Sequence, residues 1–225
     1  MSLSKKEILA EMEGADRLSE EDKEILFTGT YAYNLGRSLL DSKENDWKLG
    51  KNDVNKAIKT TFCQKAIGKI FKVDADIEAP MSKVVALLKD IERCGEWRSN
   101  FGAVENIKKI NDINVRYAAT KESIAGVISR RDIVVAHKVE ERKALYSEFS
   151  KSVTVAEKPE VKKIVRGEVK ISCLRLTPID DNRCHYTGII SADFKGRIPQ
   201  KMVDLTMNTA MFQDIYDIRK VAAKK

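Results

Sequence analysis

The stretch Gly126–Val135, GVISRRDIVV, places two arginines and an aspartate between two runs of apolar, largely β-branched residues. A buried strand does not carry unpaired charges in its middle, because burying them costs several kcal/mol. A surface loop is not normally flanked by such apolar runs either. The stretch therefore predicts a loop with an apolar tip and a charged root that leads into a half-buried strand. An ordinary tight turn with surface arginines is the alternative.

Length and composition limit the class of protein. The 225 residues, 43% of them hydrophobic, suffice for one large domain or two small ones. No apolar run approaches the 18 residues of a transmembrane helix. The start of the chain, MSLSKKEILAEMEG, has neither the apolar centre of a signal peptide nor the composition of a mitochondrial transit peptide. We therefore expect a soluble, cytoplasmic protein.

The cysteines and histidines predict neither disulfides nor metal. Cys63, Cys94, Cys173 and Cys184 form no CxxC pair, which favours reduced thiols. The two histidines lie in no metal-binding motif, so no metal or other resident cofactor is expected.

The net charge of +7 has several possible meanings. A solvated face is the usual one, and an anionic membrane surface would satisfy the same charge. The basic patches KPEVKKIVRGEVK and RKVAAKK lack the interleaved aromatic residues that stack on bases, so nucleic acid is not an expected partner.

The order of elements predicts one domain, residues 19–225, after a short leader, residues 1–18. Ser19 is a good helix N-cap, with Asp22 three residues later. The segment GKIFKVDADIEA alternates, with Phe71, Val73, Ala75 and Ile77 on one face, as in an antiparallel strand with a solvated side. A helix follows Pro80 and ends in a loop at GEWRSNFG, and a last helix runs from Pro199 to about Ala222. Between these helices we expect six strands, over 104–110, 113–120, 132–140, 144–153, 164–176 and 183–194.

The last helix has two apolar stripes. One holds Ile198, Met202, Leu205, Thr209, Phe212 and Tyr216, and the other holds Met207, Met211, Ile215, Ile218 and Ala222. Covering a sheet requires only one such face. The second face predicts a further contact, with the leader, a loop, a ligand or a membrane.

Four motifs on these elements resemble the START domain, a lipid-transfer domain, over roughly residues 46–222. They are SRRDIV, VRG, DFKGRIPQKMVD and GEW, and the nearest resemblance is to the small sterol-handling members. The resemblance implies an α+β helix-grip fold, in which a curved antiparallel sheet wraps around a long C-terminal helix and leaves an internal hydrophobic tunnel. It also implies that the loop before RDIV gates the tunnel mouth. Ile124, Val127 and Ile128 would then close the mouth or enter a bilayer, with Arg130 and Arg131 placed to meet phosphates or to pair with Asp132.

Strand parity and the resemblance together predict the side chains that line the tunnel. Cholesterol-binding members are similar in fold but carry an acid at the position of Ala118 and an arginine at that of His137, and this chain has neither. The predicted lining comprises Arg116, Ala118, Thr120, Ile133, Val135, His137 and Val139 from the strands, with Trp97, Met202, Leu205, Thr209 and Phe212 from the helices and the loop beside them.

Two polar residues stand out in this predicted lining. Arg116 is too costly to bury alone, so it pairs with Asp112 or Glu122, with water, or with an anionic ligand group. His137 donates to a ligand hydroxyl or is a satisfied core residue. Beside Trp97, where the resemblance implies a basic residue and an acid in choline-lipid carriers, this chain has Cys94 and Arg98, which disfavours a choline phospholipid.

We therefore expect a non-enzymatic, monomeric lipid carrier that associates transiently with anionic membranes. A sterol is the favoured ligand, and a carotenoid or other isoprenoid, a fatty acid and a phospholipid are alternatives. A scaffold without ligand and a helix-grip enzyme are competing classes, although no nucleophile–base pair is evident.

Overall fold

The computed structural model describes residues 7–8, 17–43, 46–53, 57–121, 123–124 and 128–224. Four helices of at least one turn lie within these residues: α2 (Glu20–Leu40), α3 (Met81–Lys89), α4 (Cys94–Trp97) and α5 (Gln200–Ala222). As predicted, Ser19 caps α2, because its side chain accepts a hydrogen bond from the backbone N–H of Asp22. Most of the leader, residues 1–6 and 9–16, lies outside the described residues.

The described strands form one ten-stranded sheet and a two-stranded hairpin. The strands are β1 (Lys48–Asp53), β2 (Ile58–Lys65), β3 (Gly68–Ile77), β4 (Phe101–Ile110), β5 (Ile113–Thr120), β6 (Ser123–Ile124), β7 (Ile128–Ser129), β8 (Arg131–Arg142), β9 (Leu145–Ser152), β10 (Val165–Arg166), β11 (Glu168–Asp180) and β12 (Arg183–Asp193). The sheet runs antiparallel in the order β1-β2-β3-β12-β11-β9-β8-β5-β4, and β10 adds to β8 in parallel. Strands β6 and β7 form the hairpin within the loop before β8.

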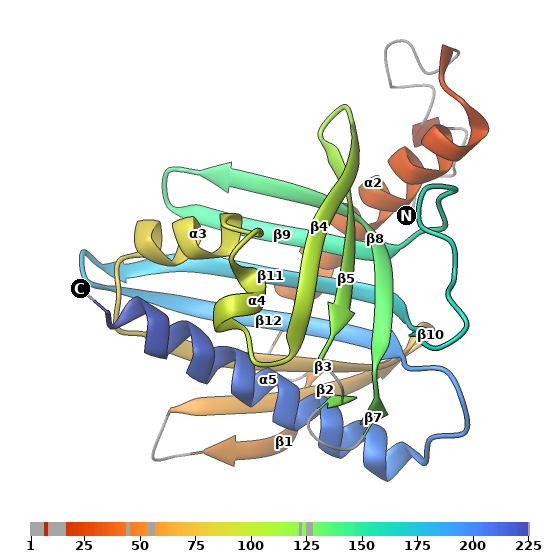
Figure 1. Ribbon diagram of the computed structural model, residues 1–225. Helices are drawn as coiled ribbons and strands as arrows, with labels where there is room; N and C mark the ends of the chain where they lie inside the picture. The colour runs from red at the N-terminus through yellow and green to blue at the C-terminus, as the bar shows by residue number, and fades with distance from the viewer. Residues whose placement is uncertain are drawn as a thin grey trace.

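The two faces of the sheet are covered by different helices. Helix α5 lies along one side and α2 along the other (Figure 1). Successive side chains of a strand point to opposite faces, so Phe71 packs into the core beneath α5 while its neighbour Ile70 packs against α2. The predicted alternation of β3 is confirmed, and so is the expected sheet around a long C-terminal helix.

Two local features lie outside the sequence-based expectations. The polar stretch after Asp41, over which no element was assigned, contains β1. This strand pairs only with β2 at the edge of the sheet, and Leu49 is 64% exposed, so it carries no apolar alternation that the sequence could reveal. The loop at GEWRSNFG begins with a single helical turn, α4.

Two of the three charged residues in SRRDIV, Arg131 and Asp132, are buried and hydrogen-bonded, whereas Arg130 is exposed. Asp132 is 1% exposed and accepts hydrogen bonds from the Nε of Arg166 at 2.8 Å and from its terminal nitrogen at 3.0 Å. Arg131 is 6% exposed, and its guanidinium donates to the carbonyl oxygens of Phe194 and Ser129 at 2.8 and 2.7 Å. The sequence motif therefore fastens the loop before β8, the segment after β12 and strand β10 to the start of β8. Arg131 does not pair with Asp132.

We predict that Arg166→Met lowers the free energy of unfolding by about 3–5 kcal/mol, because it leaves the buried Asp132 carboxylate without its partner. Arg183→Met is the matched control, since it removes an arginine from a pair with Asp180 whose side chains are 44% and 45% exposed. That pair is worth about 1 kcal/mol or less. Urea unfolding of both variants measures the difference, and equal losses would contradict a structural role for the buried pair.

Candidate functional site

A cavity of about 270 Å³ lies between α5 and the inner face of strands β5, β8, β9, β11 and β12. Its wall is mainly apolar. The strands contribute side chains such as Ile133, Val135 and Leu174, and α5 contributes Met207, Ala210 and Met211. The cavity exists because α5 packs closely on the sheet through Ile215 and Ile218 toward its C-terminal end, while its middle turns face open space.

The strand residues predicted to line a tunnel do face this cavity. Arg116, Ala118 and Thr120 of β5 and Ile133, Val135 and His137 of β8 all contribute to its wall, whereas Val139 packs in the core beneath α5. These two strands are neighbours in the sheet, with Arg116 opposite Val135, so alternate residues of both strands share the inner face.

The predicted face of α5 does not line the cavity. Met202 and Leu205 are 39% and 54% exposed, and Phe212 is buried in the core. Thr209 is likewise outside the wall, and Trp97 packs against the core cluster. The wall is formed instead by Met207, Ala210, Met211 and Asp214. Both stripes are apolar, so composition alone could not decide which one faces the sheet.

An ion pair between distant segments projects into the cavity, and no sequence pattern predicted it. A terminal nitrogen of Arg98 lies 3.5 Å from Oδ2 of Asp214, and the Nδ2 of Asn100 donates to Oδ1 of Asp214 at 3.5 Å. Burial raises the pKa of the Asp214 carboxyl, and the charge of Arg98 opposes this effect. Arg98 stays cationic at physiological pH. An acid at position 214 between Met211 and Ile218 was the available signal, since it interrupts an apolar stripe.

Arg116 has a neutral partner. Its Nε donates to the side-chain oxygen of Asn106 at 3.1 Å. The expected partner Asp112 pairs with Lys138 instead, at 2.9 Å, and Glu122 lies outside the described residues. Among the described residues no carboxylate lies within ion-pair distance of Arg116. Its positive charge is thus available to a ligand in the cavity.

His137 presents an unsatisfied ring nitrogen at the cavity wall. The side chain is 2% exposed, its Nδ1 lies 2.9 Å from Oγ of Ser150, and its Nε2 has no partner in the described part of the chain. Burial lowers the pKa of His137 to about 4, with Glu148 opposing and Arg116 assisting the shift. The ring is therefore neutral at pH 7. Depending on the tautomer, Nε2 can donate one hydrogen bond to a ligand or accept one from it.

The predicted gate residues occupy different environments. Ile128 is 3% exposed and packs inward, and Arg130 is exposed. Arg131 is committed to backbone carbonyls and is not free to meet phosphates. Val127 and the side chain of Ile124 lie outside the described part of the chain.

The chain is similar to known lipid-transfer proteins in both sequence and structure. A family model described as START domain matches residues 34–223. The mitochondrial steroidogenic acute regulatory protein of Mesocricetus auratus is 22% identical over 206 residues, covering 90% of this chain and 72% of that protein. Human StAR-related lipid transfer protein 5 has a similar structure, with a TM-score of 0.76, 16% identity, and coverage of 87% of this chain and 96% of that one. A Streptomyces aromatase/cyclase matches with a TM-score of 0.51, 13% identity, and coverage of 68% and 92%.

Three further features of the described residues concern membrane-spanning helices, metal-binding clusters and cysteines. None of the helices in the described ranges is both long enough and apolar enough to cross a bilayer. The described residues contain no cluster of side chains suited to a metal ion. All four cysteines are free and buried.

We predict that His137 makes folding pH-dependent. Its folded pKa of about 4 lies below the ordinary value of 6.5, so the unfolded chain takes up the proton first as the pH falls. The stability contributed by the neutral ring is therefore present above pH 6.5 and lost as the pH falls toward 4, by up to about 3 kcal/mol. Urea unfolding of the wild type and His137→Gln across this range tests it. Parallel stability curves for the two proteins would show that His137 titrates normally.

Proposed function

This chain belongs to the START-domain family, and on that premise we propose that it holds one hydrophobic lipid, a sterol, in the cavity beneath α5 and exchanges it with membranes. The observation that carries the proposal is the composition of the cavity wall, which is largely apolar and contains the free Nε2 of the neutral His137. A sterol has a rigid apolar body and one hydroxyl, which suits a largely apolar wall where two buried nitrogens, His137 Nε2 and Arg98 Nε, lack a hydrogen-bond partner among the described residues.

The driving force is removal of apolar surface from water. Each buried CH₂ group is worth about 0.8 kcal/mol, so a dry apolar cavity offsets the low solubility of a lipid monomer. No bond is made or broken. The hydrogen bond between the ligand hydroxyl and His137 Nε2 fixes orientation, because leaving a buried polar group unpaired costs about 1–3 kcal/mol.

Loading requires the cavity to widen. At about 270 Å³ it lies just below the common range of ligand pockets, about 300–1,000 Å³. We propose that the loop containing Ile124, Val127 and Ile128 moves against the first turns of α5. The exposed Met202 and Leu205 would then enter the bilayer. Basic residues near this end, Arg130, Arg197 and Lys201, would hold the protein at an anionic surface, each contributing about 1 kcal/mol.

Arg116 favours a second cargo class. Its guanidinium faces the cavity, and among the described residues its one hydrogen-bond partner is the neutral Asn106. A fatty acid or an anionic phospholipid would supply the missing negative charge. A carotenoid or another isoprenoid would leave Arg116 as it is.

We propose that the protein is not an enzyme. The steroidogenic and lipid-transfer names of its relatives favour carriage, although one structural neighbour is named as a cyclase. His137 has a hydroxyl partner, Ser150, rather than a carboxylate, and its low pKa makes it a poor general base at pH 7. We further propose a cytoplasmic monomer in which residues 19–225 form the lipid-binding domain, with transient membrane contact.

Filling the cavity tests the proposal. Ala210→Phe adds a ring on the wall of the cavity, so we expect purified protein to lose its bound lipid. Thr209→Phe places the same ring at the neighbouring position of α5, which does not contribute to the wall, so this variant should keep its lipid. Mass spectrometry of organic extracts, read against an extract of the untransformed host, measures both.

The identity of the extracted lipid separates the cargo classes. A stoichiometric sterol from the wild type supports the main proposal, and a fatty acid or anionic phospholipid supports the Arg116 alternative. An empty extract after incubation with mixed-lipid vesicles would contradict lipid carriage and favour a scaffold.

The membrane contact is tested by Leu205→Asp. We expect transfer of a fluorescent sterol between vesicles to slow by about tenfold, because inserting a leucine side chain is worth at least about 1.5 kcal/mol. Ile179→Asp is the matched control, since Ile179 is 43% exposed at the β11–β12 turn, away from α5's first turns. Equal rates for the two variants would place the contact elsewhere.

A further inference from the structure

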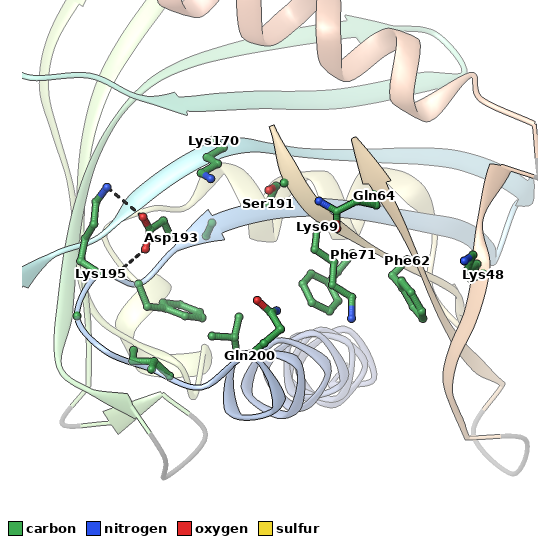
Figure 2. Close-up of a pocket in the computed structure, with 16 residues that line it drawn as sticks. Lys48, Phe62, Gln64, Lys69, Phe71, Lys170, Ser191, Asp193, Lys195 and Gln200 are labelled. Atoms are coloured by element: carbon green, nitrogen blue, oxygen red, sulfur yellow. Dashed lines mark hydrogen bonds and ion pairs between the residues drawn. The ribbon is translucent and has the colours of Figure 1, made fainter. Parts of the chain in front are cut away.

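A second hollow, of about 560 Å³, lies beside the lipid cavity. It opens between the first turn of α5 and the inner face of the sheet at β1, β2 and β3, and the segment after β12 closes one end (Figure 2). We call it the lysine cleft, because four lysines from four separate elements line it: Lys48, Lys69, Lys170 and Lys195. Residues 192–194 border both hollows, but the lysines line only this one.

Two of the four lysines are neutralised by acids. Lys69 pairs with Asp204 at 2.8 Å, and Lys195 pairs with Glu168 at 2.5 Å and with Asp193 at 3.1 Å. Within the described ranges, Lys48 and Lys170 have no acid within ion-pair distance. Lys48 lies at the far end of the cleft, whereas Lys170 lies on its sheet wall, opposite Gln200 of α5 (Figure 2). Lys170 is thus a cation without a direct ion pair inside a concave site, although its charge helps to lower the pKa of the nearby Glu168 and Asp193.

A hydroxyl without a partner lies beside Lys170. Ser191 is 2% exposed and lines the cleft, and in the described part of the chain its Oγ makes no hydrogen bond. Both groups border the space left by Gly68, where a Cβ atom would lie 3.5 Å from Lys170 Nζ and 3.9 Å from Ser191 Oγ. Gly68 adopts a φ of 109°, a conformation that favours glycine. Gly68 therefore leaves the space beside these two donors without a side chain.

We propose that the lysine cleft binds a phosphomonoester, with Lys170 and Ser191 as the principal donors. A terminal phosphate presents three oxygens and up to two negative charges, so it satisfies an ammonium group and a hydroxyl at the same time. Gln64 and Gln200 offer further amide donors, and Phe62, Phe71 and Phe194 form an apolar wall for the organic part of the ligand. Among the described residues neither donor is held in an ion pair, so both can bind a ligand without first breaking such a contact, unlike Lys69 and Lys195.

The phosphomonoester has two possible sources with the same chemistry: a soluble metabolite, or the head group of a membrane lipid such as phosphatidic acid. The site does not depend on the cargo of the neighbouring cavity, because none of its proposed donors lines that cavity. Failure of lipid carriage and failure of phosphate binding are therefore separate results.

Binding is measured with full-length protein and two probes. Isothermal titration with glycerol 3-phosphate reports the soluble ligand. Sedimentation with phosphatidylcholine vesicles, with and without phosphatidic acid, reports the membrane source. Each probe is applied to the wild type, Lys170→Met, Ser191→Ala and Lys162→Met. Lys162 is exposed in the segment between β9 and β10 and does not line the cleft, so its variant removes the same charge elsewhere.

We expect Lys170→Met to weaken binding of at least one probe by about tenfold, and Ser191→Ala by about threefold or more, as loss of a hydrogen bond to a charged group implies. Lys162→Met should leave binding unchanged. Loss restricted to glycerol 3-phosphate assigns a soluble ligand, and loss restricted to the vesicles assigns a lipid head group. The proposal is overturned if neither probe binds the wild type, or if Lys170→Met and Lys162→Met behave alike. Circular dichroism of each variant checks that the fold is intact. Mass spectrometry of the lipid extracted from each variant checks that the cavity is intact.

Discussion

The buried charges at the start of β8 hold together the parts of the molecule that surround both hollows. Asp132 binds Arg166 of β10, and Arg131 binds the carbonyl oxygen of Phe194, just before α5. Buried charges are tolerated only when geometry and hydrogen bonding compensate their desolvation, and here both conditions are met. The position at which α5 enters the fold is thus tied to β8, and through β8 to the residues that face the cavity, Ile133, Val135 and His137.

The cavity follows from how α5 is fixed at its two ends. Toward its C-terminus, Ile215 and Ile218 are completely buried against the sheet. At its N-terminal side, the Arg131–Phe194 contact holds the segment that leads into the helix. Between these points Met207 and Met211 span a space that protein side chains do not fill. Protein interiors are normally close-packed, and a void lowers stability because the side chains around it have no atoms to pack against on one side. A ligand that fills this space would therefore recover stability as well as bind.

The sequence predicted the features that depend on local periodicity. Alternation along β5 and β8 leaves only two possible inward faces, and the resemblance chose between them, so six cavity-facing residues could be identified. The same reasoning failed for α5, where two apolar stripes compete and only the tertiary arrangement selects Met207 and Met211. The contact between Arg98 and Asp214 joins residues more than a hundred positions apart, and no periodicity links them. Strand β1 was missed because an exposed edge strand needs no apolar alternation.

The cavity and the lysine cleft differ in the charged groups that line them, although residues 192–194 border both. Inside the cavity, Arg98 is compensated by Asp214, and burial keeps His137 uncharged at pH 7. Glu148, which accepts a hydrogen bond from Tyr146, and Arg116 bring opposite charges to the same wall. In the cleft, Lys170 lies where solvent can reach it, and an ammonium group in such a place keeps its charge at small cost. An apolar body is therefore favoured on one side of this wall and an anion on the other. A single ligand that reached both sites would have to cross the segment after β12, which the hydrogen bond from Arg131 to the Phe194 carbonyl oxygen holds in place. Separate ligands for the two sites are therefore favoured.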